Sequence, residues 1–482
     1  MLWRGHEEIG PIDQAWSAPA HAYTEQLRCS IPVLTTSPME MMSALKQPSE
    51  MLVSRAAQTE NTETMADRTI NDETTVAGLF WRFWTATAAS GVGSAVSSVA
   101  LPLIAVFTLH ASTFQVSLLA AAGQVGWLIL GLPAGVIVQR YPLRSLQVTM
   151  DLVRMAAIGS IPLAWALDAL TYTHLLVVTL LVGLATVLFD IGSATFLPRI
   201  IDTEELNSRN SLMSGTFAVT QTGGPSLGGF LIQAAGPAGA VLVDAASYLV
   251  SAVTLRGLPE HYADSTTKAR LLPQIREGWT FVINHPVMFP CMLWATGVNF
   301  VNGALAALVP TYLVRVAELS PFIVGLLIAM DGVGTLLGAA LTTKLAAKVG
   351  TARALFYASI GGGGLTLMMP LTTRLDNAYF FGLGYGGFAA SVVIGSILTR
   401  THRQTDSPAD LLSRVMATVR FVSWGALPVG ALLAGVFATL TGLRPAFWMV
   451  CGAALIAPAT LALSSVPRRR DLSDALHREE AS

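Results

Sequence analysis

The sequence has few charged side chains for its length. Asp, Glu, Lys and Arg make up 12% of the 482 residues, and 52% of the residues are hydrophobic. Soluble domains carry about 25% charged residues. A long chain this apolar cannot hide its hydrophobic surface in a water-soluble core, so the composition predicts a membrane protein. The formal net charge of −1 gives no support for a nucleic-acid partner.

Cysteines and catalytic motifs are also scarce. The spacing of Cys29, Cys291 and Cys451 suits neither a metal site nor a disulfide framework. The glycine-rich stretches 361–364 and 382–387 lie inside apolar runs and lack the Lys-Ser/Thr pair of a phosphate-binding loop, so we interpret them as close helix packing. We therefore expect no enzyme activity, no metal and no cofactor.

The first 78 residues differ from the rest, because Glu, Thr, Ser, Gln and Pro dominate and no apolar run is long enough to span a bilayer. A basic segment followed by a short apolar one is missing, which argues against a cleaved signal peptide. We expect 1–78 to be a disordered cytoplasmic tail. A start of translation at Met65 is an alternative.

From Phe80 onward the chain is a series of apolar runs near the ~20 residues that a membrane-spanning helix needs. Runs this long and without alternation exclude a β-barrel, the other fold that satisfies its backbone in lipid. The expected spans are 82–108, 115–138, 146–167, 173–196, 210–234, 238–256, 288–313, 321–343, 352–371, 377–399, 415–440 and 443–465. The sequence thus predicts an all-α membrane protein with twelve transmembrane helices.

Basic residues gather in alternate connections. The rich set includes Arg140, Arg144, Arg199, Arg400 and Arg468, whereas the opposite set holds little more than Arg315, Arg374 and Arg444. The positive-inside rule places the rich set and both termini in the cytoplasm. We expect an N-terminal six-helix bundle (79–256), a cytoplasmic loop (257–287), a C-terminal six-helix bundle (288–466) and a cytoplasmic tail (467–482), as in many secondary transporters.

The connection GLPAGVIVQRYPLRS (131–145) resembles the loop motif G-x-x-x-D-R-x-x-R-R of the major facilitator superfamily. Arg140 and Arg144 match the motif, whereas Gln139 and Leu143 depart from it. The resemblance implies that Arg140 and Arg144 help to close an inner gate, with Asp190 as their partner. Alternatively, both arginines only anchor the loop at the membrane surface.

A second resemblance is more specific. FDIGSATFLPRIIDTEELNSRNSLMSG (189–215) is similar to the branch of the superfamily that contains the enterobactin exporter and the macrolide efflux pumps, drug–proton antiporters among them. The following GGPSLGGFLI holds the fifth-helix motif G-P-x-x-G-G at Gly224, Pro225, Gly228 and Gly229, whose small residues allow close helix approach. Segments 276–304 and 413–448 resemble the same branch, which implies the major facilitator fold of two six-helix bundles.

Ionisable groups inside spanning helices are costly and are candidates for function. Asp331 is our predicted proton carrier, because desolvation opposes the charged form of a carboxylate and favours proton uptake. Asp244 is a second candidate; a structural hydrogen bond is the alternative for both. Asp151 and Arg154, one helical turn apart, are expected to pair. Ser94 stands where relatives often have an acid in helix one.

Polar and aromatic groups on helices two, seven, ten and eleven are the predicted substrate cavity, with helix–helix hydrogen bonds as the alternative. They are Gln124, Trp127, Thr296, Asn299, Asn302, Tyr385 and Trp424. We expect a monomeric, multi-pass protein of the bacterial inner membrane that exports a small amphipathic organic molecule by proton antiport. The alternatives are an uncoupled facilitator or importer and, more remotely, a membrane sensor.

Overall fold

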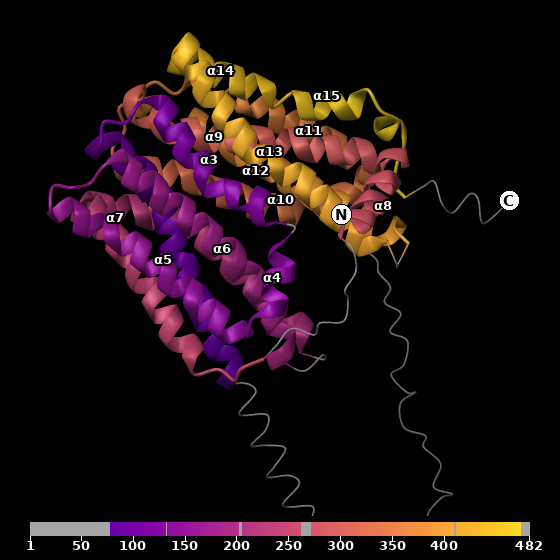
Figure 1. The fold of residues 1–482 in the computed structure, drawn as a ribbon. Coiled ribbons are helices and arrows are strands. Elements are labelled where there is room, and N and C mark those ends of the chain that lie inside the picture. Colours follow the sequence, from indigo (N-terminus) through magenta and orange to yellow (C-terminus); the bar gives the residue numbers. More distant parts are fainter. Residues whose placement is uncertain (1–77, 132, 202–204, 262–270, 409–410, 474–482) are drawn as a thin grey trace, which may run out of the picture. The chain divides into compact units, whose positions relative to one another are not determined.

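The computed structural model describes residues 78–131, 133–201, 205–261, 271–408 and 411–473, and every regular element there is a helix (Figure 1). Eleven of the described helices are long and apolar enough to cross a membrane. The longest, α7 (Leu206–Arg256), has 51 residues, or ~77 Å, more than twice the ~30 Å of a bilayer core. Its backbone leaves the helical region at Gly236 (φ 74°). Since α7 is therefore two crossings, the predicted twelve-helix fold is confirmed.

The helices form two bundles, each packed mainly within itself. The N-bundle contains the first helix (Gly78–Thr108, ending in the π-helical turn η1, Ile104–Thr108), α3 (Thr113–Leu130), α4 (Ala134–Arg140), α5 (Leu143–Ala166), α6 (Tyr172–Ile200) and α7. The C-bundle contains α8 (Leu271–Asn284), α9 (Met288–Arg315), α10 (Pro321–Val349), α11 (Thr351–Thr366), α12 (Tyr379–Asp406), α13 (Leu412–Thr441), α14 (Leu443–Ala453) and α15 (Ile456–Ala462). Three short 3-10 turns complete it: η2 (Met369–Leu371), η3 (Leu375–Asn377) and η4 (Val466–Arg468).

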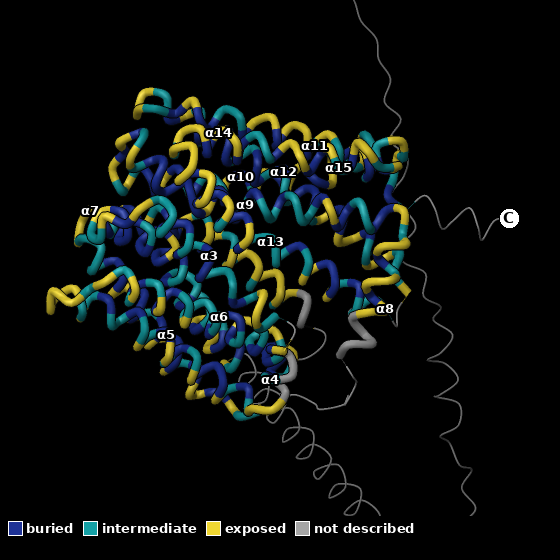
Figure 2. Tube along the Cα trace, turned by 45° about the horizontal axis from the view of Figure 1, so that its top comes forward, coloured by how far each residue is buried: buried dark blue, intermediate teal, exposed yellow. Residues whose placement is uncertain are grey.

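Exposed residues recur along the spans (Figure 2), and many of them are large and apolar. Leu163 is 62% exposed, Val253 59% and Leu337 57%. Soluble monomers do not present apolar surface on this scale to water. This surface therefore faces lipid, and the chain is a multi-pass membrane protein.

Among the labelled helices, the main contacts between the bundles are α3 with α13, α3 with α9, and α7 with α10. Small residues permit the approach: Ala121, Ala307 and Ala431 form one buried cluster that includes all three helices of the first two pairs. Arg315, at the end of α9, donates a hydrogen bond of 2.5 Å to the carbonyl of Ala111, just before α3. These contacts join the bundles toward the end that has few arginines.

The hydrophobic core has the same asymmetry. One continuous buried cluster includes Leu103 of the N-bundle and Leu308 of the C-bundle. At the arginine-rich end the core is divided, with one cluster around Phe196 in the N-bundle and another around Val415 in the C-bundle. α4 and α8, which belong to that end, lie apart in Figures 1 and 2. The bundles are therefore packed together at one end and separate at the other.

Candidate functional site

A pocket of about 270 Å³ lies in the N-bundle between the first helix, α5, α6 and α7. Hydroxyl groups make up much of its wall; they are Thr87, Ser90, Ser94, Thr186, Ser193, Thr216 and Thr220. The wall also contains two aromatic rings, those of Phe189 and Phe217, and two charged side chains, those of Arg154 and Asp190. A mixed wall of this kind suits an amphipathic organic molecule.

Arg154 is the most buried cation of this site. It forms an ion pair with Asp151, one turn earlier on α5, and the two side chains are 2% and 0% exposed. The predicted pairing is thus confirmed. The guanidinium also lies between the rings of Phe189 and Tyr248, at 4.1 and 4.5 Å from their centroids. Aromatic faces stabilise a desolvated cation, so α5, α6 and α7 together hold this charge inside the bundle.

Asp244 is fully buried in α7, one helical turn before Tyr248. Ser97 of the first helix donates a hydrogen bond to its carboxylate, and Ser247 approaches it at 3.4 Å. The hydroxyls of Tyr248 and Ser94 are 3.0 Å apart. A buried carboxylate needs such donors, and these link the first helix to α7. We call Asp151, Arg154, Asp190, Asp244 and Tyr248 the N-bundle polar cluster.

Asp331 lies in the middle of α10, half buried. It belongs to the stripe of α10 that packs on α12, since Gly334, three residues later, approaches Gly386 there. Tyr385, next to Gly386 on α12, is buried at this level, because a Cβ atom added to Gly386 would lie 3.1 Å from the carbonyl oxygen of Met330, the neighbour of Asp331. Within the described ranges, Asp331 has no hydrogen bond or ion pair. Two residues that the sequence assigned to different roles, carrier and cavity, therefore lie together.

A second pair of predicted residues also meets, across the boundary between the bundles. The rings of Trp127 on α3 and Trp424 on α13 pack edge to face with centroids 4.7 Å apart. Arg420, one turn before Trp424, places its guanidinium 4.8 Å from the Trp127 centroid and 4.4 Å from the Trp424 centroid. Arg420 is not among the residues predicted from the sequence. Its i, i+4 spacing to Trp424 is the signal that was available.

The structure gives no contact between different helices for the other predicted cavity residues that it describes, Gln124, Thr296, Asn299 and Asn302. Thr296 and Asn299 donate hydrogen bonds to carbonyls of their own helix, at Met292 (2.8 Å) and Ala295 (2.9 Å). Gln124 and Asn302 are half buried. Among the described residues that line the N-bundle pocket, none belongs to the seven predicted cavity residues.

The fifth-helix motif packs helices closely. A Cβ atom added to Gly228 would lie 2.9 Å from the carbonyl oxygen of Val96 in the first helix. Gly224, one turn earlier beside Pro225, approaches Ala95 in the same way. Gly229 faces the C-bundle, where an added Cβ would lie 3.1 Å from the Cα of Gly325 on α10. The motif therefore joins α7 to the first helix and to the opposite bundle.

The arginines of the α4–α5 connection do not contact Asp190. Arg144 pairs with Glu260 at 2.7 Å and donates to the carbonyl of Leu258 at 3.0 Å, and Arg140 is exposed at the end of α4. Asp190 lies ten residues before the end of α6, about 15 Å deeper than the helix end at 1.5 Å per residue. Arg154 and Arg420 are the cations whose charges act on it. Depth in the membrane thus separates Asp190 from its predicted partners.

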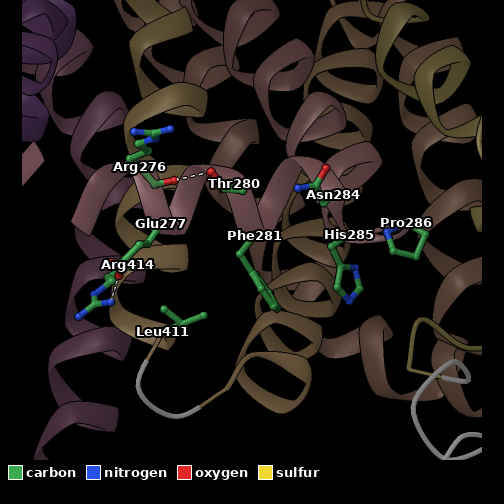
Figure 3. Close-up of a pocket in the computed structure, with 9 residues that line it drawn as sticks. All are labelled: Arg276, Glu277, Thr280, Phe281, Asn284, His285, Pro286, Leu411 and Arg414. Atoms are coloured by element: carbon green, nitrogen blue, oxygen red, sulfur yellow. Dashed lines mark hydrogen bonds and ion pairs between the residues drawn. The ribbon is translucent and has the colours of Figure 1, made fainter. Parts of the chain in front are cut away.

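A larger pocket of about 650 Å³ lies at the arginine-rich end of the C-bundle, between α8 and the start of α13 (Figure 3). Arg414 of α13 pairs there with Glu277 of α8. His285, at its edge, accepts hydrogen bonds at Nδ1 from the backbone amides of Val287 (3.2 Å) and Met288 (3.1 Å). Its described lining residues all come from the C-bundle.

The sequence is similar to those of bacterial membrane transporters. The chain is 24% identical to the multidrug efflux pump Tap of Mycolicibacterium fortuitum, over 74% of this chain and 88% of that protein. It is 26% identical to the uncharacterised MFS-type transporter YfiS of Bacillus subtilis (strain 168), over 76% of this chain and 88% of the relative.

Solved structures share the fold. The nucleoside transporter NupG superposes with a TM-score of 0.64 at 11% identity, covering 80% of this chain and 98% of NupG. An inward-facing, occupied bacterial homologue of the human lysosomal transporter Spinster gives 0.62 at 17% identity, covering 82% and 96%. The family model described as transmembrane secretion effector matches residues 75–480. With its twelve crossings in two bundles, the chain belongs to this family of the major facilitator superfamily.

Proposed function

We propose that the protein exports a small amphipathic organic molecule from a bacterial cell by alternating access, driven by proton antiport. The observation that carries the proposal is the divided core at the arginine-rich end, opposite a continuous core at the other end. The positive-inside rule puts the arginine-rich end and both termini in the cytoplasm. On this orientation the structure is the inward-facing state, ready to take substrate from the cell interior.

The N-bundle pocket supports an amphipathic substrate, because hydroxyls, aromatic rings and two charges share its wall. The relative named as a multidrug efflux pump supports the outward direction of transport. Closing the inner side would bring α4 and the α4–α5 connection toward the C-bundle, with exposed Arg140 among the residues that move. Arg144 would keep or exchange its partner Glu260.

Asp331 is the proposed proton carrier. A carrier must be reached from both sides of the membrane in turn, and Asp331 is half buried without a hydrogen-bond or ion-pair partner among the described residues. Asp244 is fully buried and receives a hydrogen bond from Ser97, so its role is to hold the first helix against α7. The two aspartates therefore make a matched pair for a test.

The test begins with susceptibility panels of strains that lack or overproduce the protein, which identify a transported compound. Export of that compound is then measured with and without an uncoupler. Asp331→Asn is expected to abolish uncoupler-sensitive export at normal protein level. Asp244→Asn, which keeps the size of the side chain, is expected to lower protein stability and to leave residual export uncoupler-sensitive. Full export by the Asp331→Asn variant would refute the assignment.

An uncoupled facilitator is the second candidate, and one observation favours it. Ser94 of the first helix contacts Tyr248 through hydroxyl groups alone, so this position offers no carboxylate to carry a proton. A facilitator moves substrate only down its gradient. Equal uptake and release rates that an uncoupler leaves unchanged would select the facilitator over the antiporter.

A further inference from the structure

Arg420 is a cation at the boundary between the two bundles. It lies on α13 eight residues after the helix begins, well inside the span, and its side chain is exposed. Among the residues that the structure describes, none forms a hydrogen bond or an ion pair with its guanidinium. Charges inside the membrane normally pair with protein groups or mark a ligand path. The missing partner thus points to a ligand.

Two indole rings lie beside this guanidinium. Trp127 of the N-bundle and Trp424 of the C-bundle lie within 5 Å of its carbon, measured from their ring centroids. Aromatic rings attract the cation through their π faces. The N–H groups of a guanidinium lie along its edge in a planar fork that matches a carboxylate. Because no described residue forms a hydrogen bond or an ion pair with Arg420, its fork is available to a ligand, and we call Trp127, Arg420 and Trp424 together the stack.

The surrounding charges decide which ligand is favoured. Asp190, on α6, is the carboxylate whose charge acts on Arg420, and Arg400 of α12 adds a second positive charge. Arg154, the other cation near Asp190, is already neutralised by Asp151. Among the described residues, the charges of Arg420, Arg400 and Asp190 add up to one positive charge. An organic cation would have to enter against two arginines, whereas an organic anion is attracted.

We propose that the Trp127–Arg420–Trp424 stack is a subsite for an organic acid, which places amphipathic anions among the substrates of this transporter. The carboxylate of the ligand accepts hydrogen bonds from Arg420, and its apolar ring body packs on the two indoles. Because the stack joins both bundles, a ligand bound there contacts the two parts that move against each other. The inference rests on the proposed transport function for its biological meaning.

Binding to the purified full-length protein in detergent tests the proposal, with three probes of the same aromatic body. Pyrenebutyrate carries a carboxylate, pyrenebutanol is neutral and pyrenebutylamine is a cation. Energy transfer from tryptophan to pyrene reports binding. We expect the acid to bind at least about tenfold more tightly than the alcohol, as a charge-assisted hydrogen bond supplies. We expect the amine to bind no better than the alcohol.

Variants locate the effect. Arg420→Gln should remove the preference for the acid, and Arg420→Lys should keep part of it. Asp190→Asn should leave acid binding equal or tighter, because it removes a competing negative charge. Arg374→Gln, in a connection at the opposite end, is the matched control. Size-exclusion profiles and binding of pyrenebutanol show that each variant is folded.

Equal binding of the three probes, binding of none, or an amine preference that Asp190→Asn abolishes would overturn the anion subsite. Transport is measured separately in vesicles. Acid binding that depends on Arg420 without any export would leave the subsite standing and remove the proposed exporter. Export of neutral compounds without acid binding would do the reverse.

Discussion

The ion pair between Asp151 and Arg154 offers a sharp test of how the N-bundle is held together. Both side chains are at most 2% exposed, so removal of either partner leaves a buried charge without compensation. Breaking a buried pair in this way costs about 3–5 kcal/mol. Arg154→Met also loses the contacts with Phe189 and Tyr248, worth about 2 kcal/mol for a desolvated cation. We expect each single variant to lose about 3 kcal/mol or more.

The double variant Asp151→Leu/Arg154→Met replaces the pair by apolar side chains of similar size. Replacing a buried pair is often neutral, but the double variant still loses the two ring contacts of Arg154. We therefore expect it to lose about 2 kcal/mol, less than either single variant. Unfolding in mixed micelles of increasing SDS content, followed by tryptophan fluorescence, gives the free energies for a double-mutant cycle. The reasoning fails if the double variant is as unstable as the sum of the single variants.

Other perturbations test separate parts of the structure. Burial lowers the pKa of His285 more than the charge of Asp406 raises it, so the folded protein favours the neutral ring and its stability should fall as the pH drops below about 6.5. Protonation of Nδ1 would break the hydrogen bonds from Val287 and Met288. His285→Asn keeps a hydrogen-bond acceptor at this position and should reduce the pH dependence of thermal unfolding between pH 5 and 8, roughly the range in which histidine titrates. The buried His402, whose ring lies 5.6 Å from that of His285, remains in this variant. Gly229→Leu should force α7 away from Gly325 of α10 and reduce export, while the protein still inserts into the membrane. A pair of cysteines introduced on α7 and α10 across this contact should then form a crosslink more slowly. An unchanged crosslinking rate would contradict the expected displacement.

The sequence by itself determined the number of crossings and the resemblance to the family. A helix needs about 20 apolar residues to span a bilayer. Such runs can be recognised in the sequence without knowing how the helices pack. The Gly-Pro motif of α7 was also readable, because Gly228 and Gly229 allow a close approach that a larger residue would prevent. The long helix α7 shows the limit at one point, since its two predicted spans meet at Gly236 without a loop.

Only the tertiary structure decided which polar groups meet. Helices that are apolar on every face carry little periodic signal, so the rotation of each helix about its axis is set by packing against its neighbours. Thr296 and Asn299, predicted to line the cavity, bond to their own helix, whereas Arg154 and Arg420 are positioned by rings from other helices. Depth acts in the same way: Asp190 lies too far inside the span to reach Arg144 and is influenced by Arg154 and Arg420 instead.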